Sequence, residues 1–596
     1  MSHDIAKNKD RLFQLTNFTG SSGLAIVFRN HKPVFITDNR YKIQSQIEVD
    51  EQVFEIQDPD QSVDLQQLIK DRYDWQNLGG DIMIDGSLFS MQFYENLSKR
   101  LLEEGIQLNV NLDQPIIDEA VQISESIKSQ SKEAEVKVYK LEEKYSGESS
   151  KAKVEKIFSH QKSKNLEAIF VSSPEEVCWV TNLRALGSHE YEPIFNGFLL
   201  LMKNERSYLF LDDDCQKGFL KTEAIKQCDI DIEVKSVNEF QSVIQSLDQN
   251  LLHSVGIDKK SCQQKYYQIL KDKFKHQILF DSFSPISELR VIKNESELKG
   301  IKEALKLESA ALICFYANLK EKLIKNQVIY EHEGPAILDK IRKEIALDYF
   351  LGNSFPMIMG SGPNGAIVHY RAKEGSSLRL QHNLPFLVDT GAQYLFGTTD
   401  TTRTHLFDTT LLQKEGHLNY LKDMYTRVLI GNLALQETKF PLGKTYAHQL
   451  DALARRSLWE VGEDFKHGVG HGVSHCGPVH EYPHYAYGKN PQSALMLQEG
   501  MIITNEPGFY KEGQFGIRIE NITQVEKYND QFLKFKALTL VPYCKNLISR
   551  SLLDKSYQRT IKEYYTRIEK DVVPIIKSRN NQYEIDFLGD EMIDFI

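Results

Sequence analysis

A chain of 596 residues is too long to fold around a single hydrophobic core, so its sequence has to encode several domains. Its apolar fraction of 41% and its charged fraction of 26% are ordinary for a soluble globular protein. On length alone we expect about three or four domains.

The composition argues against several classes of protein. A net charge of −11 argues against a nucleic-acid or anionic-membrane partner, because both require a basic surface. No apolar run approaches the roughly 20 residues of a membrane span, and the start, "MSHDIAKNKDRLFQL", lacks the apolar centre of a secretory signal. The seven cysteines form no CxxC pair, which is typical of a reducing compartment. We therefore expect a cytoplasmic protein with no nucleic-acid or membrane partner.

Two α/β units are predicted in the N-terminal half, over residues 1–125 and 157–285. Each contains two apolar runs on either side of a turn. These runs are Gly23–Phe28 with Val34–Asp38, and Gly197–Met202 with Tyr208–Asp214. The repeated hairpin is consistent with an internal duplication, although hairpins are common enough for the repetition to be a coincidence. Residues 126–156 are charged and nearly free of bulky apolar side chains, so we predict a linker that leads into a helix.

A third unit is predicted over residues 286–545. Asn294 and Glu297 have the spacing of a helical capping box, and the residues after them are apolar at helical intervals. Helices and glycine-rich strands then alternate to about Leu540.

Residues 546–596 are predicted to form a C-terminal helical extension that breaks at Pro574. One face of its first helix is apolar, and this face either packs on its own domain or forms a subunit contact. The residues of this face are Tyr557, Ile561, Tyr564, Ile568 and Val572.

Two aspartates in "VDTGAQYLFGTTDTTRTH" (388–405) follow or end strand-like runs. On one straight strand, Asp389 and Asp400 would point to opposite faces because they are eleven residues apart. If the chain folds back as a hairpin near Gly397, the two carboxylates converge; otherwise they are ordinary turn aspartates.

Two glutamates in "IITNEPGFYKEGQFGIRIENI" (502–522) raise a similar question. Glu506 ends an apolar run, and Glu520 lies among isoleucines, where an unpaired carboxylate is costly. Arg518 is two residues from Glu520 and would project from the same face, so the alternative is a neutralising ion pair between them.

Between the two acidic segments, "HGVGHGVSHCGPVHE" (467–481) contains four histidines and a cysteine. His467 and His471 have helical spacing, but each glycine near them would cost a helix roughly 1 kcal/mol, so a strand or loop is expected. Carboxylates with one or two imidazoles suit a pair of divalent ions such as manganese, cobalt or zinc. A two-metal site generates hydroxide near neutral pH and stabilises a tetrahedral intermediate.

Five segments, in this order, resemble motifs of aminopeptidase P, the Xaa-Pro aminopeptidase branch of the pita-bread metallopeptidases, in its long three-domain eukaryotic form. They are "GPNGAIVHY", "DTGAQYLFGTTDTTRT", "HGVGHGV", "VHEYP" and "TNEPGFYKEGQFGIRIEN". The segments "TNFTGSSGLAIV", "YSGESS" and "VCWVTNLR" resemble the N-terminal part of the same family. The resemblance implies an α/β (α+β) fold with two creatinase-like N-terminal α/β domains followed by a C-terminal pita-bread metallopeptidase domain.

The resemblance also implies a metal site with two divalent ions, Mn²⁺ first, with Zn²⁺ or Co²⁺ as alternatives. Asp389 is expected to bind one ion, Asp400 and Glu520 to bridge both, and His471 and Glu506 to complete the other.

For catalysis, the resemblance implies that a hydroxide bridging the two ions attacks the scissile carbonyl. Glu506 is expected to act as general base and then as general acid, while His480 and His369 stabilise the oxyanion.

For the substrate, the resemblance implies that His467, Tyr510 and Arg518 surround a proline ring. An amide before proline has no N–H and its ring fixes φ, so it requires a dedicated pocket. The implied activity is removal of the N-terminal residue from peptides with proline at position two, by a cytoplasmic homodimer.

The chain departs from the family pattern beside these residues. Ser474 stands where the family has a glycine, and Gly477 replaces a larger side chain, so the loop beside His480 is expected to be reshaped. His475 and Cys476 match nothing in the pattern and are expected to lie at the surface or behind the ligands, without chemistry.

Two other functions remain open from the sequence. A prolidase, which cleaves only Xaa-Pro dipeptides, has a similar active site, although the extra domain here favours aminopeptidase P. Pita-bread domains also serve as non-catalytic binding proteins, but these typically lose the metal ligands that are intact here. The N-terminus is shorter than is usual in the family, so we expect a trimmed first domain or a sequence that begins late.

Overall fold

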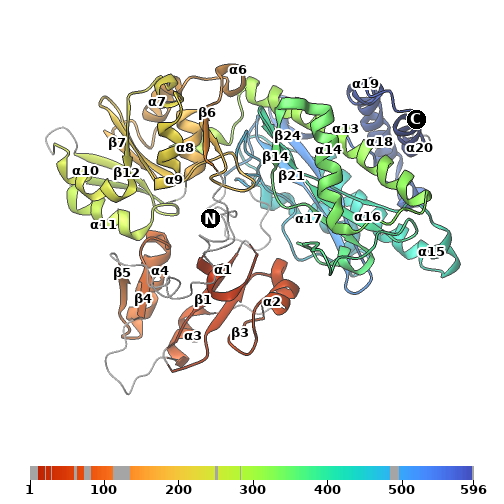
Figure 1. Ribbon diagram of the computed structural model, residues 1–596, viewed down its shortest axis with the longest axis horizontal. Coiled ribbons are helices and arrows are strands. Elements are labelled where there is room, and N and C mark those ends of the chain that lie inside the picture. The colour runs from red at the N-terminus through yellow and green to blue at the C-terminus, as the bar shows by residue number, and fades with distance from the viewer. Residues whose placement is uncertain are drawn as a thin grey trace. The chain divides into compact units, whose positions relative to one another are not determined.

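The computed structural model describes residues 11–20, 22–28, 30–58, 64–72, 82–111, 135–248, 253–274, 276–281, 283–482 and 495–592. The chain divides into two compact units, Met1–Arg290 and Val291–Ile596 (Figure 1). Within the described ranges, none of the helices has the length and apolar character that crossing a lipid bilayer requires.

The N-terminal unit begins with the first predicted hairpin. β1 (Gly23–Ile26) pairs antiparallel with β2 (Val34–Thr37), and β3 (Glu55–Ile56) adds to β2 in parallel. The core of this small sheet is mainly aromatic, with Phe18 and Phe35 in contact.

A parallel pair of strands follows in the same unit. β4 (Ile82–Asp85) and β5 (Leu108–Asn111) pair in parallel, and α4 (Met91–Glu103) connects them. A helix is the usual connection between parallel strands because the chain has to return to the same edge of the sheet.

The second domain of the N-terminal unit is built on a six-stranded sheet with strand order β11-β10-β9-β7-β12-β13. The strands are β7 (Ala168–Val171), β9 (Gly197–Met202), β10 (Ser207–Leu211), β11 (Ile232–Ser236), β12 (Ser254–Asp258) and β13 (His276–Phe280). β9 and β10 are the second predicted hairpin. Alternate residues face two separate cores, so that Leu199 belongs to one and Leu200 to the other. Burial on both faces explains the uninterrupted apolar run "GFLLLM".

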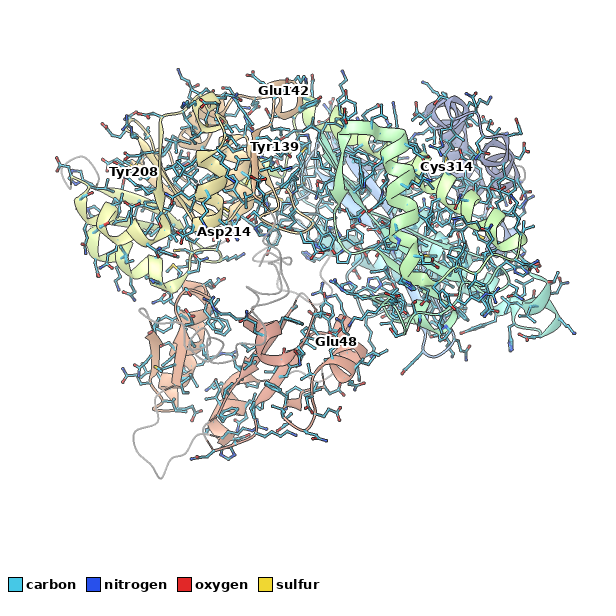
Figure 2. The ribbon with its side chains drawn as sticks, viewed as in Figure 1. Glu48, Tyr139, Glu142, Tyr208, Asp214 and Cys314 are labelled. Atoms are coloured by element: carbon cyan, nitrogen blue, oxygen red, sulfur yellow. The ribbon has the colours of Figure 1, made fainter. Side chains whose placement is uncertain are left out.

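The predicted linker is part of this second domain wherever the structure describes it. β6 (Lys137–Lys140) pairs antiparallel with β8 (Leu183–Leu186), and α7 (Ser150–Ser159) is the predicted helix. Val136 and Val138 are buried, because alternation with polar residues gives this charged segment one apolar face. Figure 2 shows Tyr139 of β6 and Tyr208 of β10 in this domain. Residues 126–134 of the predicted linker lie outside the described residues.

The C-terminal unit opens with the predicted capping box. Asn294 is the N-cap of α13 (Glu295–Ile324), where its side chain accepts the Glu297 N–H at 3.0 Å and the Glu297 carboxylate accepts the Asn294 N–H at 2.9 Å. The unit begins at Val291, whereas the sequence predicts a boundary at residue 286, because Pro285–Arg290 forms the last helix of the preceding unit.

Two antiparallel sheets carry the strands of the predicted acidic segments. One contains β15 (Ile358–Ser361), β16 (Phe386–Thr390) and β19 (Thr401–His405). The other contains β20 (Lys439–Pro441), β25 (Phe532–Ala537), β24 (Asn521–Lys527) and β21 (Ile502–Asn505). The long helices α13, α14 (Gly334–Ala346), α16 (Leu418–Glu437) and α17 (Ala447–Trp459) lie over these strands (Figure 1).

The C-terminal residues form helices, as predicted, but they share the core of the unit instead of extending from it. The helices are α18 (Lys555–Asp571), α19 (Val573–Ser578) and α20 (Gln582–Met592). The apolar face of α18 is covered by its own unit, with Ile561 and Ile568 fully buried and the Tyr564 hydroxyl bonded to the Val541 backbone. Of the two alternatives for this apolar face, packing on its own domain or a subunit contact, the structure shows packing on its own domain.

Candidate active site

Asp389 and Asp400 are brought together by the hairpin that was predicted near Gly397. β17 (Ala392–Tyr394) and β18 (Gly397–Thr398) pair antiparallel, and β16 and β19 pair on either side of them with Asp389 opposite Thr402. Because Thr390 also lies opposite Thr401, the strand pairing brings Asp389 next to the chain at Asp400, and the charge of Asp389 contributes to raising the pKa of Asp400. The alternative of two unrelated turn aspartates is thereby excluded.

The two glutamates are brought together by strand register. In the pair β21 and β24, Asn505 lies opposite Asn521. The next position along one strand and the preceding position on the other are Glu506 and Glu520, so an antiparallel register places them side by side. Ligand atoms of Asp400 and Glu520 lie within 4.8 Å of one another and of His471, and Glu506 Oε1 lies 3.7 Å from His471 Nε2, so these acids share one site.

His471 completes this group from a third segment. Its backbone is held between strands, because its N–H donates to Thr504 Oγ1 at 2.9 Å and its carbonyl accepts the Thr504 N–H at 2.8 Å. Its Nδ1 lies 2.9 Å from the Gly472 carbonyl, which can only accept, so Nδ1 carries the proton. The lone pair of Nε2 therefore faces the acids, 3.4 Å from Asp400 Oδ2 and 3.7 Å from Glu506 Oε1.

The donor set fits divalent metal ions. Ligand atoms of Asp400, His471 and Glu520 lie within 4.8 Å of one another, and all three residues are buried. Asp389 Oδ1 and Glu520 Oε1 are buried without a hydrogen-bond partner among the described residues. Burial, and then the charge of neighbouring carboxylates, raises the pKa of both Asp400 and Glu520 well above the usual range. A buried group of this kind is stable when a cation compensates its charge.

Three residues expected to bind substrate form a chain of hydrogen bonds beside the acids. His467 Nδ1 lies 2.8 Å from the Gly468 carbonyl, which leaves Nε2 to accept from the Tyr510 hydroxyl at 2.8 Å. Arg518 donates to the same hydroxyl at 2.7 Å and to Asp389 Oδ2 at 2.5 Å. The ion pair of Arg518 is thus with Asp389, and the alternative in which it neutralises Glu520 is not observed.

The two remaining predicted residues lie at the edge of the group. The His480 ring is exposed to solvent and its centroid lies 4.3 Å from that of His471. His369 is half-buried in the turn after η6 (Gly362–Ala366), and the carbonyl of Val368 before it accepts a hydrogen bond from Arg518 at 3.4 Å.

Two threonines that sequence reasoning missed hold the acids in place. Thr402 Oγ1 donates to Glu520 Oε2 at 2.7 Å and accepts from Arg518 Nε at 3.2 Å. Thr504 Oγ1, besides accepting from His471, donates to Glu506 Oε1 at 3.3 Å. The signal in the sequence is that each threonine stands on a strand two residues from an acid at the end of that strand, Asp400 or Glu506, a spacing that directs side chains to one face.

The reshaped loop is buried and fixed. The Gly477 carbonyl accepts hydrogen bonds from Gln393 at 2.9 Å and from Thr398 at 3.2 Å. Of the two expected positions for His475 and Cys476, at the surface or behind the ligands, the surface is excluded, since they are 6% and 0% exposed. Glycine and proline allow the chain to turn inward here, and Cys476 adopts a positive φ of 50°.

Removal of divalent ions should make the protein less stable as the pH rises. The pKa values of Asp400, Glu506 and Glu520 are raised, so the folded metal-free state keeps protons that the unfolded chain releases above about pH 4. The stability that depends on these groups is complete below that pH and is lost as the pH rises towards neutrality.

Thermal unfolding of chelator-treated protein measures this effect. The Tm should be lower at about pH 8 than at about pH 5, and added Mn²⁺ should remove most of the difference. A Tm that rises with pH in the absence of metal would contradict the prediction.

Models of known families match most of the chain. Residues 299–527 match metallopeptidase family M24, and residues 531–592 match the C-terminal region of peptidase M24. Residues 5–116 and 129–297 each match a creatinase/prolidase N-terminal domain, in agreement with the repeated α/β unit.

Two relatives span nearly the whole chain. A probable Xaa-Pro aminopeptidase P of Laccaria bicolor is 33% identical, over 97% of this chain and 87% of that protein. The chain belongs to the aminopeptidase P family. Another family member, Xaa-Pro aminopeptidase 1 of Dictyostelium discoideum, is 30% identical over 98% of this chain and 91% of that protein.

Solved structures agree with the family assignment. An X-prolyl aminopeptidase of Caenorhabditis elegans, described as a cytosolic enzyme with a di-nuclear active site, covers 99% of this chain and 93% of its own, with a TM-score of 0.86 and 25% identity. An Xaa-Pro dipeptidase of Bacillus anthracis covers 66% of this chain, with a TM-score of 0.50 and 23% identity, so it shares the fold. The predicted fold class, two creatinase-like domains and a pita-bread metallopeptidase domain, is confirmed.

Proposed function

We propose that this chain is a two-metal aminopeptidase that releases the N-terminal residue from peptides with proline at position two. The observation that carries the proposal is the buried group of four carboxylates and one imidazole, in which two carboxylate oxygens have no partner among the described residues. The aminopeptidase P relatives and the di-nuclear site named for the C. elegans enzyme support it.

The ligands are assigned as follows. Asp389 would hold one ion, His471 and Glu506 would hold the other, and Asp400 and Glu520 would be shared by both. With four carboxylates and one imidazole the donor set is rich in hard oxygen atoms, which favours Mn²⁺, with Zn²⁺ or Co²⁺ as alternatives. Elemental mass spectrometry of protein purified without chelators tests this, with about two ions per chain expected.

When bound, the ions supply a nucleophile derived from water near neutral pH and polarise the scissile carbonyl. Glu506 accepts the proton of the attacking water on its carboxylate and delivers it to the leaving proline nitrogen, which lacks a proton of its own. His480 and His369 donate hydrogen bonds to the carbonyl oxygen as negative charge develops there.

The proline ring is held by Tyr510 and His467, with Arg518 behind them. Their hydrogen-bond chain fixes both rings, because each polar atom of the chain already has a partner within the protein. The fixed rings present an apolar slot with polar edges, which suits a proline ring better than a flexible side chain.

The test of the function is a matched pair of peptides that differ only in the second residue. Replacing proline by alanine removes the ring and restores an N–H, which should cost roughly 2 kcal/mol of transition-state binding, or about thirtyfold in kcat/KM. Equal rates on the two peptides would indicate a general aminopeptidase. A dipeptide cleaved in preference to longer Xaa-Pro peptides would indicate a prolidase.

We place the enzyme in the cytosol and expect a homodimer formed by the C-terminal unit. Since the apolar face of α18 is covered by its own unit, another surface of that unit makes the contact. Light scattering at micromolar concentration should give twice the 68.7 kDa mass of the chain. A single-chain mass under these conditions would reject the dimer.

A further inference from the structure

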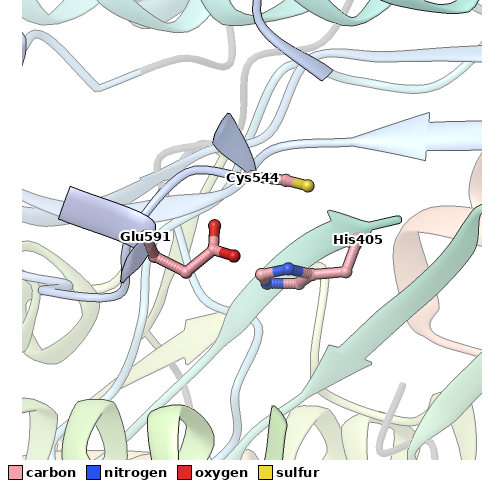
Figure 3. A group of neighbouring side chains, drawn as sticks. All are labelled: His405, Cys544 and Glu591. Carbon is pink, nitrogen blue, oxygen red and sulfur yellow. The ribbon is translucent and has the colours of Figure 1, made fainter. Parts of the chain in front are cut away.

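A second group of metal-ligating side chains lies in the C-terminal unit, and none of its members belongs to the carboxylate group. His405 ends β19, Cys544 precedes η8 (Lys545–Leu547), and Glu591 lies near the end of α20. One ligand atom from each lies within 4.8 Å of the others, and all three residues are buried. Figure 3 shows the imidazole facing the carboxylate, with the sulfur atom beside them.

The imidazole of His405 is the unexplained member of this group. It is 2% exposed, yet neither Nδ1 nor Nε2 has a hydrogen-bond partner among the described residues. The Tyr316 ring packs against it with centroids 4.0 Å apart, so the imidazole is held in place on the side away from solvent. Buried polar atoms are almost always paired, and an imidazole with two unpaired nitrogens, one of them close to a thiol and a carboxyl, indicates an absent partner.

The buried Glu591 makes no ion pair of its own among the described residues. Its Oε2 accepts the Lys545 backbone N–H at 3.3 Å. The side chains of Lys545 and Lys320 both bind the half-buried Asp590, and their positive charges act on Glu591 from there without contacting it directly. Cys544 is fully buried, with its sulfur 3.4 Å from the Leu406 backbone nitrogen.

We propose that His405, Cys544 and Glu591 bind a structural zinc ion. A thiolate, an imidazole and a carboxylate are the donor types that zinc takes, and a tetrahedral site then has one position left for water or a backbone oxygen. In a tetrahedral site, zinc bonds of about 2.0–2.3 Å place two ligand atoms roughly 3.3–3.8 Å apart. The three ligand atoms lie within 4.8 Å of one another, so zinc binding would require them to move closer by up to about 1.5 Å. The double positive charge of the ion would be balanced by the thiolate and the carboxylate.

The site would tie together three segments that are far apart in the sequence. β19 belongs to the sheet that contains Asp389, Cys544 follows β25, and α20 is the last helix among the described residues. Zinc binding would fasten the C-terminal helix to the strand that follows Asp400 without touching the peptide. The expected role is stability of the C-terminal unit, not chemistry.

Cobalt substitution of the full-length protein tests the proposal. Co²⁺ bound to a thiolate gives a charge-transfer absorption in the near ultraviolet, which the active site cannot produce because its proposed ligands are carboxylates and an imidazole. Titration of chelator-treated protein with Co²⁺ should show this absorption, together with binding of a third ion beyond the two of the active site.

Three variants identify the ligands. Cys544→Ser should lose the absorption. The isosteric Glu591→Gln should need a Co²⁺ concentration about tenfold higher, or more, to produce the same absorption. Cys314→Ser, which removes another buried thiol from the same unit (Figure 2), is the matched control and should keep it. Zn²⁺ should raise the Tm of the Cys314→Ser protein by more than that of Glu591→Gln. The proposal would be overturned if the wild-type protein lacked the absorption or if the Cys544→Ser protein retained it. If Cys544→Ser does not fold, the proposal would be overturned by a Glu591→Gln protein that needs no more Co²⁺ than the wild type.

Discussion

Asp400→Asn should abolish tight metal binding and lower kcat/KM on an Xaa-Pro peptide by about 10³-fold or more. Asp400 is buried, and the negative charges of Asp389 and Glu506 help to raise its pKa. Its Oδ2 lies 3.4 Å from His471 Nε2. Asparagine keeps the shape of the side chain but removes the charge, so neither ion retains the bridging carboxylate that the proposed site requires.

The same substitution should make the metal-free protein more stable. Without a cation, these buried carboxyl groups have to keep protons or repel one another as the pH rises, and Asp400→Asn removes one of them. We therefore expect lost activity together with a higher Tm after chelation, a combination that ordinary damage to the fold does not give. Asp530→Asn, at a turn residue that is 96% exposed, is the matched control and should change neither quantity. An Asp400→Asn protein with two bound ions and full activity would reject the assignment.

Much of the fold was predictable because local signals agreed with the final packing. The capping box at Asn294 starts a helix whether or not the rest of the unit is folded. The two β-hairpins of the N-terminal unit have turn residues between apolar runs, and both pair as expected. The composition of the charged segment 126–156 does not indicate the strand β6, because composition averages over two faces, whereas only one face of β6 needs to be apolar.

At the candidate site, the sequence predicted which residues meet but not how they pair. Arg518 and Glu520 are two residues apart, which suggested an ion pair between them, yet Arg518 binds Asp389 from a distant strand. Whether Arg518 pairs with Asp389 or with Glu520 depends on the neighbouring sheet, since Thr402 lies between Arg518 and Glu520 and forms a hydrogen bond with each. Pairings of this kind are set by tertiary packing, and no spacing along one strand encodes them.

His480→Ala should lower kcat by about 10²–10³-fold while both ions stay bound, which is the effect of removing one donor to a developing oxyanion. The imidazole is exposed at the edge of the group, with its ring centroid 4.3 Å from that of His471, and it is not among the buried side chains whose ligand atoms cluster. The KM should change little, because the hydrogen bond is made mainly in the transition state.

Two other histidines of the same segment provide the comparison. His471→Ala removes a proposed ligand and should lower metal content together with activity. His475→Ala should keep the metal and change kcat by less than about threefold, because the acid beside its ring is Glu297, which is not a proposed ligand, with Nδ1 3.9 Å from Glu297 Oε1. Since His475 is 6% exposed, its truncation should instead cost about 1–3 kcal/mol of stability. Metal analysis, steady-state kinetics and thermal unfolding on the three variants separate the roles: metal lost from His475→Ala, or from His480→Ala, would show that the ligand within this segment is not His471 alone.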